Sequence, residues 1–507
     1  MLVPLVVACA LFMENMDSTV IATSLPAIAQ DLHQDPITLK LALTSYLLSL
    51  AVFIPASGWA ADRFGARPIF RGAIVIFVLG SILCGLSASL PAFIASRVVQ
   101  GLGGAMMVPV GRLVLLRSVP REELVTALAY LTVPALLGPI LGPPLGGFIT
   151  TYFEWRWIFW INVPVGILGV VLATLFIPDI REKVVWPLDV PGFILSGTGL
   201  SCLSFGLTVV GRSIVPAPIT AGLVLGGALL IVAYVVHARR VRFPIIDLGL
   251  LRIPTFRASV TGGFTFRMGI GALPFLLPLL FQLGFGLNPF QSGCLTFAAA
   301  AGAMLMKTTA KPILRRFGFK RVLVWNAVLS SFFMVAYGLF TPATPQLLLW
   351  AALLGGGFLR SLQFTSINAL AYADIDAPSM SRATSFASVA QQLSLSTGVA
   401  AGAGAIELSQ WWHGDALLAT RDFGAAFFAV AVLSASASLV FTRLPVDAGD
   451  LLRGASKRNA AAAVAPSGGL GDQPATLLAR SADPVSRAEL VASRAGDGAP
   501  RNPVART

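Results

Sequence analysis

Long apolar stretches separated by short polar loops run from the N-terminus of the sequence to near Arg443. Each stretch holds roughly 20 residues, the length of α-helix that crosses a hydrocarbon core about 30 Å thick. Because a soluble core does not need so many stretches of this length, the pattern predicts an all-α integral membrane protein with fourteen transmembrane helices. We expect these spans at residues 2–29, 40–61, 70–88, 91–116, 122–150, 157–177, 189–210, 218–238, 258–283, 289–311, 321–340, 346–372, 383–407 and 422–442.

The composition agrees with a membrane protein. Hydrophobic residues make up 56% of the 507 residues and charged residues only 12%, whereas soluble domains carry about 25% charged residues. A formal net charge of +13 would favour a nucleic-acid partner in a soluble protein, but the basic residues lie mainly in loops between the spans. We therefore expect a surrounding lipid bilayer and no nucleic-acid partner.

The four cysteines stand singly in apolar segments, with no CxxC pair and no histidine at metal-ligand spacing. We expect them to be packing residues, and we expect no disulfide, metal or cofactor. They are Cys9, Cys84, Cys202 and Cys294.

Lysine and arginine are concentrated in alternate loops, and such residues are retained on the cytoplasmic side of a membrane. Placing the loop with Arg63, Arg67 and Arg71 inside leaves few basic residues in the outer loops. The inner loops then also hold Arg117, Arg121, Arg181, Lys183, Arg239, Arg240, Arg242, Arg252, Arg257, Lys311, Arg315, Arg316, Lys320, Arg321 and Arg382, and the outer loops hold Lys40, Arg156, Arg212 and Arg421. Both termini are therefore expected in the cytoplasm, for a multi-pass protein of a bacterial inner membrane.

A short internal repeat divides the chain. The string DRFGAR at residues 62–67 resembles RRFGFK at residues 315–320, and both follow a span and lie in inner loops. Two six-helix halves related as parallel repeats, with two inserted central helices, would place the strings equivalently. Residues after 445 are poor in large apolar side chains and are expected to be disordered. The expected parts are the N-terminal half at 1–177, inserted helices and linker at 178–257, the C-terminal half at 258–445 and a cytoplasmic tail at 446–507.

Charged residues inside the spans carry the functional information, because each costs several kcal/mol in lipid unless it meets a partner or a polar cavity. Glu14 and Asp17 are three residues apart and share one helix face. A buried carboxyl can be neutral, and a nearby arginine favours its charged form, so a conformational change can load and release a proton. Arg97 lies at a depth similar to Asp17, so the two can meet. We expect Asp17, Glu14 and Arg97 to couple proton movement; the alternative is a permanent ion pair that only fixes packing.

Further polar residues lie mid-span in the second half. We expect Arg267, Gln282, Arg360, Gln363 and Asn368 to line a substrate path. The alternative, which explains most buried amides, is hydrogen bonding between helices.

The fifth span is dense in glycine and proline. Glycines four residues apart let another helix backbone approach closely, and prolines bend the helix. We expect this helix to rock or seal against another. The residues are Gly138, Pro139, Gly142, Pro143, Gly146 and Gly147.

Four strings resemble motifs of the major facilitator superfamily, and in particular of its fourteen-helix drug:proton antiporters. Residues 58–67 (GWAADRFGAR) resemble the loop signature whose acidic and basic residues latch the halves together, which implies a cytoplasmic gate. Residues 97–104 (RVVQGLGG) are similar to the fourth-helix motif, and residues 138–147 (GPILGPPLGG) to the antiporter motif. Residues 17–20 (DSTV), followed by 25–28 (LPAI), resemble the first-helix signature. The gate residues implied are Gly58, Asp62, Arg63, Gly65 and Arg67.

Two positions depart from the family pattern. Ala22 stands where the first-helix motif usually carries asparagine, which removes a polar group from this part of the span. Arg315 replaces the acid in the second copy of the loop, so the resemblance assigns the latch to the first copy.

These observations predict a monomeric secondary transporter that exports amphipathic drugs or other small organic compounds in exchange for protons. No GxxxxGK[ST] string supports direct use of ATP. One alternative is an exporter of organic anions or metabolites, since three mid-span arginines outnumber two carboxylates. A non-transporting sensor and a membrane enzyme are further alternatives, but His33, His237 and His413 fall at loops or helix ends. No motif specifies a periplasmic adaptor protein.

Overall fold

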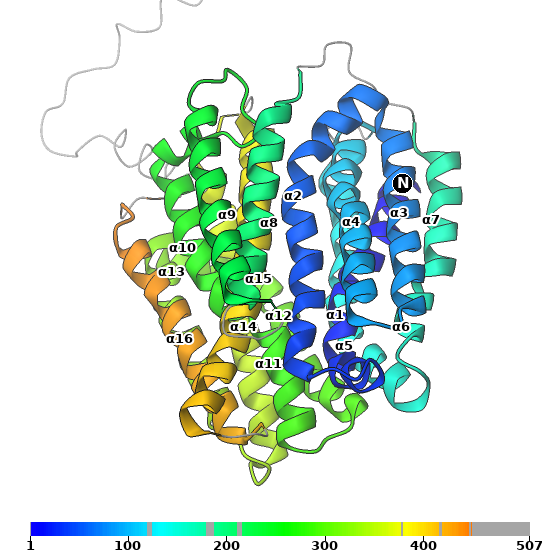
Figure 1. Cartoon of the computed structure of the whole chain (residues 1–507). Coiled ribbons are helices and arrows are strands. Elements are labelled where there is room, and N and C mark those ends of the chain that lie inside the picture. The colour runs from blue at the N-terminus through cyan, green and yellow to red at the C-terminus, as the bar shows by residue number, and fades with distance from the viewer. Residues whose placement is uncertain are drawn as a thin grey trace, which may run out of the picture. The chain divides into compact units, whose positions relative to one another are not determined.

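The computed structural model describes residues 2–118, 124–178, 187–209, 215–376, 379–414, 418–445 and 448. All regular elements within these ranges are helices (Figure 1). The predicted tail at residues 446–507 falls outside them apart from Ala448, as do Arg121, Arg181, Lys183 and Arg212 of the predicted loops.

The first half of the chain contributes one bundle of helices. Within it, α1 packs against α5 and α7, while α4 packs against α2 and α3. The elements are α1 (Leu2–Asp31), η1 (Pro36–Leu39), α2 (Lys40–Phe64), α3 (Ala66–Leu86), α4 (Leu90–Ser118), α5 (Leu124–Tyr152), α6 (Trp157–Trp160) and α7 (Asn162–Phe176).

The second half contributes another bundle, in which α12 packs against α14, α13 against α16, and α10 against α15 and α16. Its elements are η3 (Leu248–Arg252), α10 (Pro254–Gly271), α11 (Leu273–Leu279), η4 (Leu280–Gly284), α12 (Pro289–Phe317), α13 (Phe319–Gly338), α14 (Gln346–Ala371), α15 (Met380–His413) and α16 (Thr420–Thr442).

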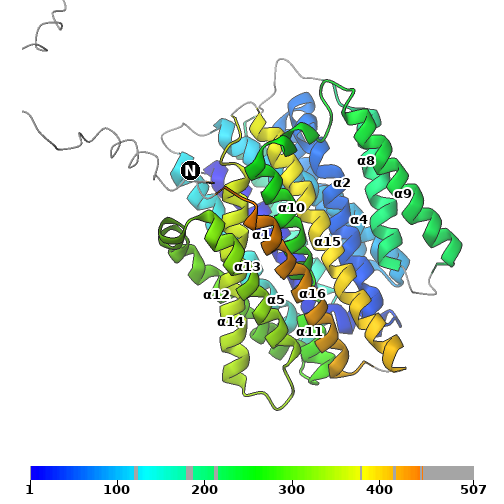
Figure 2. The ribbon, with the colours of Figure 1, turned by 90° about the vertical axis from the view of Figure 1, so that its left-hand side faces the viewer.

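Two helices lie between the bundles in sequence, α8 (Val190–Val209) and α9 (Ala217–Ala238). They pack on each other, and α8 also contacts α2 and α15 (Figure 2). Leu225, Leu229 and Val232 of α9 are each at least 60% exposed. Apolar side chains with this exposure are suited to lipid, so they agree with a membrane span.

Eleven helical segments of the described chain are long and apolar enough to cross a membrane. Three further helices, α5, α12 and α15, contain 29, 29 and 34 residues and occupy the other predicted spans. The all-helical membrane fold is thus confirmed, and fourteen remains an approximate number of spans.

Two predicted spans are not single helices. Residues 157–177 form α6 and α7, which meet at Ile161, and residues 258–283 form α10, α11 and the π-helical turn η4. Proline has no N–H to donate to the preceding turn, and Pro164, Pro274 and Pro278 lie at these interruptions. A hydropathy pattern does not register such breaks, because the residues on both sides stay apolar.

The two copies of the short repeat form the same turn. Gly65 ends α2 with φ 99° and ψ 141°, and Gly318 ends α12 with φ 78° and ψ 159°. Each glycine donates its N–H over 3.0 Å to the carbonyl four residues earlier, on Ala61 and Leu314 respectively. Only glycine adopts this region of φ and ψ readily, which explains why both copies carry it. We call the end of the two bundles that holds these turns the α2–α3 end, and the opposite end, where α1 leads into α2, the α1–α2 end.

Candidate functional site

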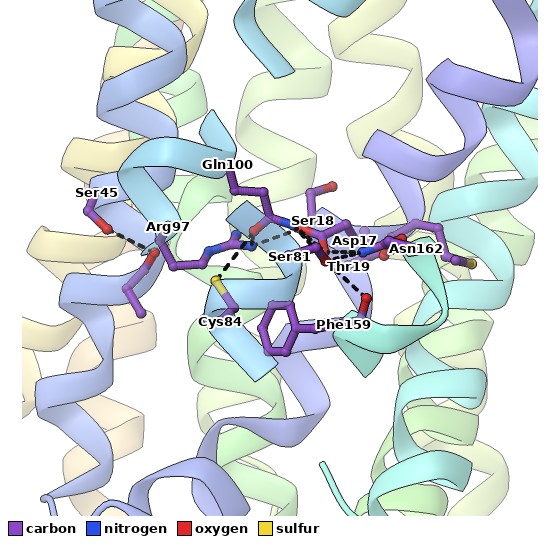
Figure 3. A network of polar contacts seen from close by, with 12 residues as sticks. Asp17, Ser18, Thr19, Ser45, Ser81, Cys84, Arg97, Gln100, Phe159 and Asn162 are labelled. Atoms are coloured by element: carbon purple, nitrogen blue, oxygen red, sulfur yellow. Dashed lines mark hydrogen bonds and ion pairs between the residues drawn. The ribbon is translucent and has the colours of Figure 1, made fainter. Parts of the chain in front are cut away.

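Asp17 and Arg97 form an ion pair in the interior of the first bundle, as Figure 3 shows. Arg97 Nη1 donates to Asp17 Oδ2 over 2.8 Å, and both side chains are 1% exposed. The pair joins α1 to α4. A charge buried inside a membrane protein is costly unless it is paired, so each of these two residues compensates the charge of the other. The depths estimated from the sequence indicated that these two residues can meet, and in the structure they do.

Two amides complete the hydrogen bonding of Asp17. Gln100 Nε2 and Asn162 Nδ2 each donate to Asp17 Oδ1 over 2.8 Å. Asn162 comes from the first turn of α7, where the predicted sixth span breaks. Both oxygens of the Asp17 carboxylate thus accept hydrogen bonds in the arrangement seen here.

A serine hydroxyl links the amides to the backbone. Asn162 Nδ2 and Gln100 Nε2 also donate to Ser81 Oγ, at 2.9 and 3.3 Å, and Ser81 Oγ donates to the carbonyl of Phe159 at 3.0 Å (Figure 3). Gly80 allows this contact, since a Cβ there would lie 2.5 Å from Gln100 Cα. The network thus spans α1, α3, α4, α6 and α7.

Arg97 has two other contacts. It donates to Gln100 Oε1, and its Cζ lies 4.2 Å from the centroid of the Tyr46 ring on α2. A guanidinium over an aromatic face is stabilised by the ring quadrupole. Helix α2 is thereby connected to the same charge.

Glu14 lies one turn before Asp17 and is 8% exposed. Within the described part of the chain, its Oε2 atom has no hydrogen-bond partner, and the same is true of the Tyr46 hydroxyl. Glu14 Oε1 and the Tyr46 hydroxyl both lie near Gly104. A Cβ on Gly104 would be 3.7 Å from Glu14 Oε1 and 3.1 Å from the Tyr46 hydroxyl. Among the residues that the structure describes, Glu14 therefore lies beside the network and forms no hydrogen bond into it, unlike Asp17.

The glycines of α5 provide the close helix contact expected of them. A Cβ on Gly138 would lie 2.9 Å from Met16 N, and one on Gly146 would lie 2.5 Å from Val20 O. A Cβ on Gly142 would collide with Thr19, and one on Gly147 with Pro289 of α12. The face of α5 with Gly138, Gly142 and Gly146 thus packs closely on α1, and Gly147 packs closely on α12 of the second bundle. Its prolines Pro139 and Pro143 line a cavity described below.

Several contacts join the two bundles near the α1–α2 end. Lys40 of α2 pairs with Glu407 of α15 at 2.7 Å. Gln282 Nε2 donates to the carbonyl of Thr23 over 2.8 Å, and the N–H of Phe290 donates to the hydroxyl of Thr151 over 3.0 Å. The bundles are therefore held together at this end.

A cavity of about 240 Å³ lies between the bundles. Arg360 of α14 and Lys307 of α12 are the charged side chains among its lining residues. Helices α1, α5, α11 and α12 supply most of the wall, which includes Ala22. Asp17 meanwhile keeps three donors, so the missing asparagine at position 22 does not leave its carboxylate unpartnered.

The other proposed substrate-path residues lie outside this lining. Arg267 Nη2 donates to Asn368 Oδ1 over 2.7 Å. Gln363 is fully buried; it accepts a bond from Asn326 at 2.9 Å and donates one to the carbonyl of Leu323 at 2.9 Å. The observed bonds of Arg267, Asn368 and Gln363 join helices of the second bundle, whereas Gln282 bonds to Thr23 of the first bundle.

The gate residues lie at the α2–α3 turn. Asp62 is partly buried and Arg63 is exposed in the last turn of α2, and Gly65 forms the turn itself. A Cβ on Gly58 would meet nothing within 4 Å, so this glycine is not required for packing in the arrangement seen here. The latch role of this loop remains a prediction, together with that of Arg67.

Within the described ranges, no group of three or more His, Cys, Asp and Glu residues is placed to hold a metal ion. Sequence reasoning missed Gln100, Ser81 and Asn162 as members of the charged network. Gln100 lies one turn after Arg97 and inside the string at residues 97–104, and these two signals could have identified it.

Comparisons with known proteins agree with this architecture. The family model for the Major Facilitator Superfamily matches residues 7–399. A protein from Shigella boydii that carries the multidrug resistance name MdtD is 37% identical over 450 residues, covering 87% of this chain and 94% of its own length. A protein of the same name from Yersinia enterocolitica is 37% identical over 448 residues, covering 88% and 95%.

Solved structures show the same fold at low sequence identity. A D-xylose-proton symporter aligns with a TM-score of 0.63 at 14% identity, over 88% of this chain and 98% of its own. The human organic anion transporter MFSD10 aligns with a TM-score of 0.56 at 15% identity, over 87% and 99%. The chain is a multi-pass integral membrane protein, and it belongs to the major facilitator superfamily.

Proposed function

We propose that this protein is a proton-coupled secondary transporter that exports amphipathic drugs or other small organic compounds by alternating access. The observation that carries the proposal is the buried ion pair between Asp17 and Arg97, at 2.8 Å and 1% exposure on both sides. The relatives named for multidrug resistance support the substrate class. The fourteen-helix drug:proton antiporter group is the matching branch of the family.

Proton coupling follows from what holds Asp17. A proton on Asp17 replaces a carboxylate by a neutral carboxyl, so Arg97 loses its anionic partner. Gln100 and the Tyr46 ring then hold Arg97 alone. Removing one partner of a buried pair costs about 3–5 kcal/mol, which is large enough to shift a conformational equilibrium. Proton binding at Asp17 thus weakens the contact between α1 and α4.

Glu14 is the second proton-coupling residue in this proposal. Its unpartnered Oε2 lies one turn from Asp17 on the same helix. A proton leaving Asp17 can therefore be held next on Glu14, towards the α2–α3 end of α1.

The moving parts are the two bundles. We assign residues 1–177 and 258–445 as the halves that rock against each other, residues 178–257 as the inserted helices and linker, and 446–507 as a cytoplasmic tail. The contacts at the α1–α2 end hold that end closed in one state of the transport cycle. The loop with Gly58, Asp62, Arg63, Gly65 and Arg67 forms the gate at the α2–α3 end. Helix α5 seals against the second bundle at Gly147, beside Pro289 of α12.

The distribution of basic loops places the α2–α3 end, with both termini, in the cytoplasm of a bacterium. The protein then lies in the inner membrane and exports its substrate away from that side. We propose a monomer, since each chain contains both halves and the cavity between them.

Transport by purified protein in proteoliposomes tests the proposal. An imposed pH gradient, acidic inside, is expected to drive accumulation of amphipathic substrates, and a protonophore is expected to abolish it. Asp17→Asn removes the charge while keeping the side-chain shape, and is expected to lower gradient-driven accumulation by about tenfold or more. Gradient-driven accumulation by Asp17→Asn at the wild-type level would refute the coupling role.

Asp31→Asn is the matched control. Asp31 lies at the end of the same helix, pairs with Arg156 at 2.8 Å and is 42% exposed. Exposed ion pairs contribute about 0–1 kcal/mol, so this variant is expected to transport normally. Loss of transport in both variants would indicate a general effect of carboxylate removal in α1.

A further inference from the structure

The cavity between the bundles differs in its charge from the ion-paired interior of the first bundle. Of the described residues that line it, two are cations, Arg360 and Lys307, and none is a carboxylate. Its remaining polar side chains are hydroxyls of serine and threonine. The electrostatic character of the lining is therefore positive.

Arg360 is distinguished from the other buried arginines by its partners. Arg97 is paired with Asp17, and Arg267 is bonded to Asn368 and lies 5.3 Å from the Phe364 ring. Across the part of the chain that the structure describes, no hydrogen bond or ion pair is recorded for Arg360, which is half-buried against the cavity. A guanidinium offers five donors and is costly in a membrane without an acceptor. The cavity is the place from which an acceptor can come.

Lys307 adds a second charge to the same wall. Its ammonium donates to the Thr365 hydroxyl over 3.0 Å, and the side chain is exposed. It lies ten residues before the end of α12, or about 15 Å from that end at 1.5 Å per residue. On α14, Thr365 bonds to Lys307 and Ser361 bonds to the carbonyl of Ala303, so Arg360 lies about one helical turn farther from the α2–α3 end than Lys307. The ammonium is thus placed between that end and the guanidinium, along a route that an anion would follow.

The carboxylates of α1 do not offset these charges. Thr19 lines the cavity, and Asp17 lies two residues before it, about 200° around the helix. The Asp17 carboxylate accordingly points into the first bundle, where Arg97 and two amides hold it. A cationic ligand in the cavity would meet two like charges at low dielectric, with no acid to receive it.

Apart from these two cations and the hydroxyls, the wall is apolar. Its other side chains offer no hydrogen bonds, so the body of a ligand must be apolar too. These residues include Leu273, Pro274, Leu277, Pro278, Ala299 and Met304.

We infer that the cavity binds amphipathic organic anions, with Arg360 receiving the anionic group, Lys307 guiding it and the apolar wall holding the body. The inference rests on the proposed export function and names its substrate class. The group recognised is a carboxylate or sulfonate, which accepts the paired donors of a guanidinium.

Binding by matched probes tests the inference. Naphthyl, biphenyl and decyl compounds, each as carboxylate, carboxamide and amine, are measured by equilibrium dialysis against the full-length protein in lipid nanodiscs. Within a set, the carboxylate is expected to bind about tenfold or more tightly than the amide, because a hydrogen bond to a charged group is lost in the amide. The amine is expected to bind weakest.

Two variants assign the effect to the cavity. Arg360→Gln is expected to remove the preference for carboxylate over amide, and Lys307→Gln to reduce it. Arg360→Lys keeps the charge and is expected to keep part of the preference, which covers the case in which Arg360→Gln fails to fold. Arg321→Gln is the control, because it removes one positive charge from an exposed position on α13 outside the cavity lining.

The outcomes separate this inference from the proposed function. Tighter binding of the amines, no binding by any carboxylate, or an undiminished carboxylate preference in both Arg360→Gln and Lys307→Gln would each overturn the inference. Proton-driven accumulation of amines in proteoliposomes would leave the export function standing while refuting the anion class. Carboxylate binding that needs Arg360, without proton-driven transport, would support the anion site and refute proton coupling.

Discussion

Lys40 on α2 donates a hydrogen bond of 2.7 Å to Glu407 on α15, so one ion pair ties the two bundles together near the α1–α2 end. The side chain of Lys40 is 2% exposed and that of Glu407 is 18% exposed. Lys40 is one of the few basic residues that the sequence places outside, and its burial against Glu407 explains its presence there. The pair forms only while α2 and α15 are close, so it stabilises the arrangement in which this end is closed.

Glu407→Gln is expected to favour opening of the α1–α2 end. The substitution leaves the buried ammonium of Lys40 without this charged partner, at a cost of about 3–5 kcal/mol to the closed arrangement. Spin labels at Gln34 and Trp412, in a variant whose four cysteines are replaced by serine, measure the separation by double electron–electron resonance. The distribution is expected to move to longer distances.

The charge-reversed double variant Lys40→Glu with Glu407→Lys serves as the control, because it restores a pair of opposite charges. It is expected to recover the short distance, whereas each single reversal is expected to lengthen it. A distance distribution unchanged by Glu407→Gln would show that the pair does not hold this end closed.

Asn162→Ala is expected to weaken proton coupling more than substrate binding. Asn162 Nδ2 donates to Asp17 Oδ1 over 2.8 Å and to Ser81 Oγ over 2.9 Å, and both bonds are lost. A hydrogen bond to a charged group contributes about 1.5–3 kcal/mol, so gradient-driven transport is expected to fall about tenfold or more. The measurement is accumulation under an imposed pH gradient, compared with equilibrium binding of the same substrate.

Asn326→Ala provides the comparison, since it also removes a buried amide. Asn326 bonds to Gln363 and to the carbonyl of Leu359, which join α13 to α14 away from the ion pair. We expect this variant to lower the thermal unfolding midpoint without a selective loss of coupling. Equal coupling in Asn162→Ala and the wild type would contradict the assigned role of Asn162.

The charged core of the site was accessible from the sequence, but its polar surroundings were not. Asp17 and Arg97 stand out because ionised side chains are rare inside membrane spans and their depths can be estimated from helix rise. Asn162 and Asn326 look alike in sequence, as amides in apolar helices. Only the three-dimensional packing of α7 against α1 and α3 brings Asn162 to the carboxylate.

The same limit applies to the arginines of the second bundle. Arg267 and Arg360 both lie mid-span, and no sequence pattern distinguishes one from the other. Packing places Asn368 and the Phe364 ring next to Arg267, while Arg360 faces a cavity. The helices themselves were predictable because the length of an apolar stretch is enough to identify a span. The breaks near Pro164 and Pro274 were not predictable from hydropathy, because the residues on both sides of each break are apolar.

Gly146→Ala is expected to disturb the contact between α5 and α1. A Cβ at this position would lie 2.5 Å from the carbonyl oxygen of Val20 and 2.8 Å from Thr23 Oγ1. The first of these atoms belongs to the backbone and cannot rotate away, so the two helices must separate. Overpacking of this kind costs about 1–3 kcal/mol. We expect a lower thermal unfolding midpoint and slower transport, measured on the purified variant.

Gly226→Ala on α9 is the matched substitution, because a Cβ there would meet nothing within 4 Å. Alanine is favoured over glycine in a helix by about 1 kcal/mol, so this variant is expected to unfold at the same or a higher temperature and to transport normally. If Gly146→Ala also behaved in this way, α5 and α1 would have to tolerate a wider spacing than the one observed. The glycine spacing of α5 would then not be needed for its close contact with α1.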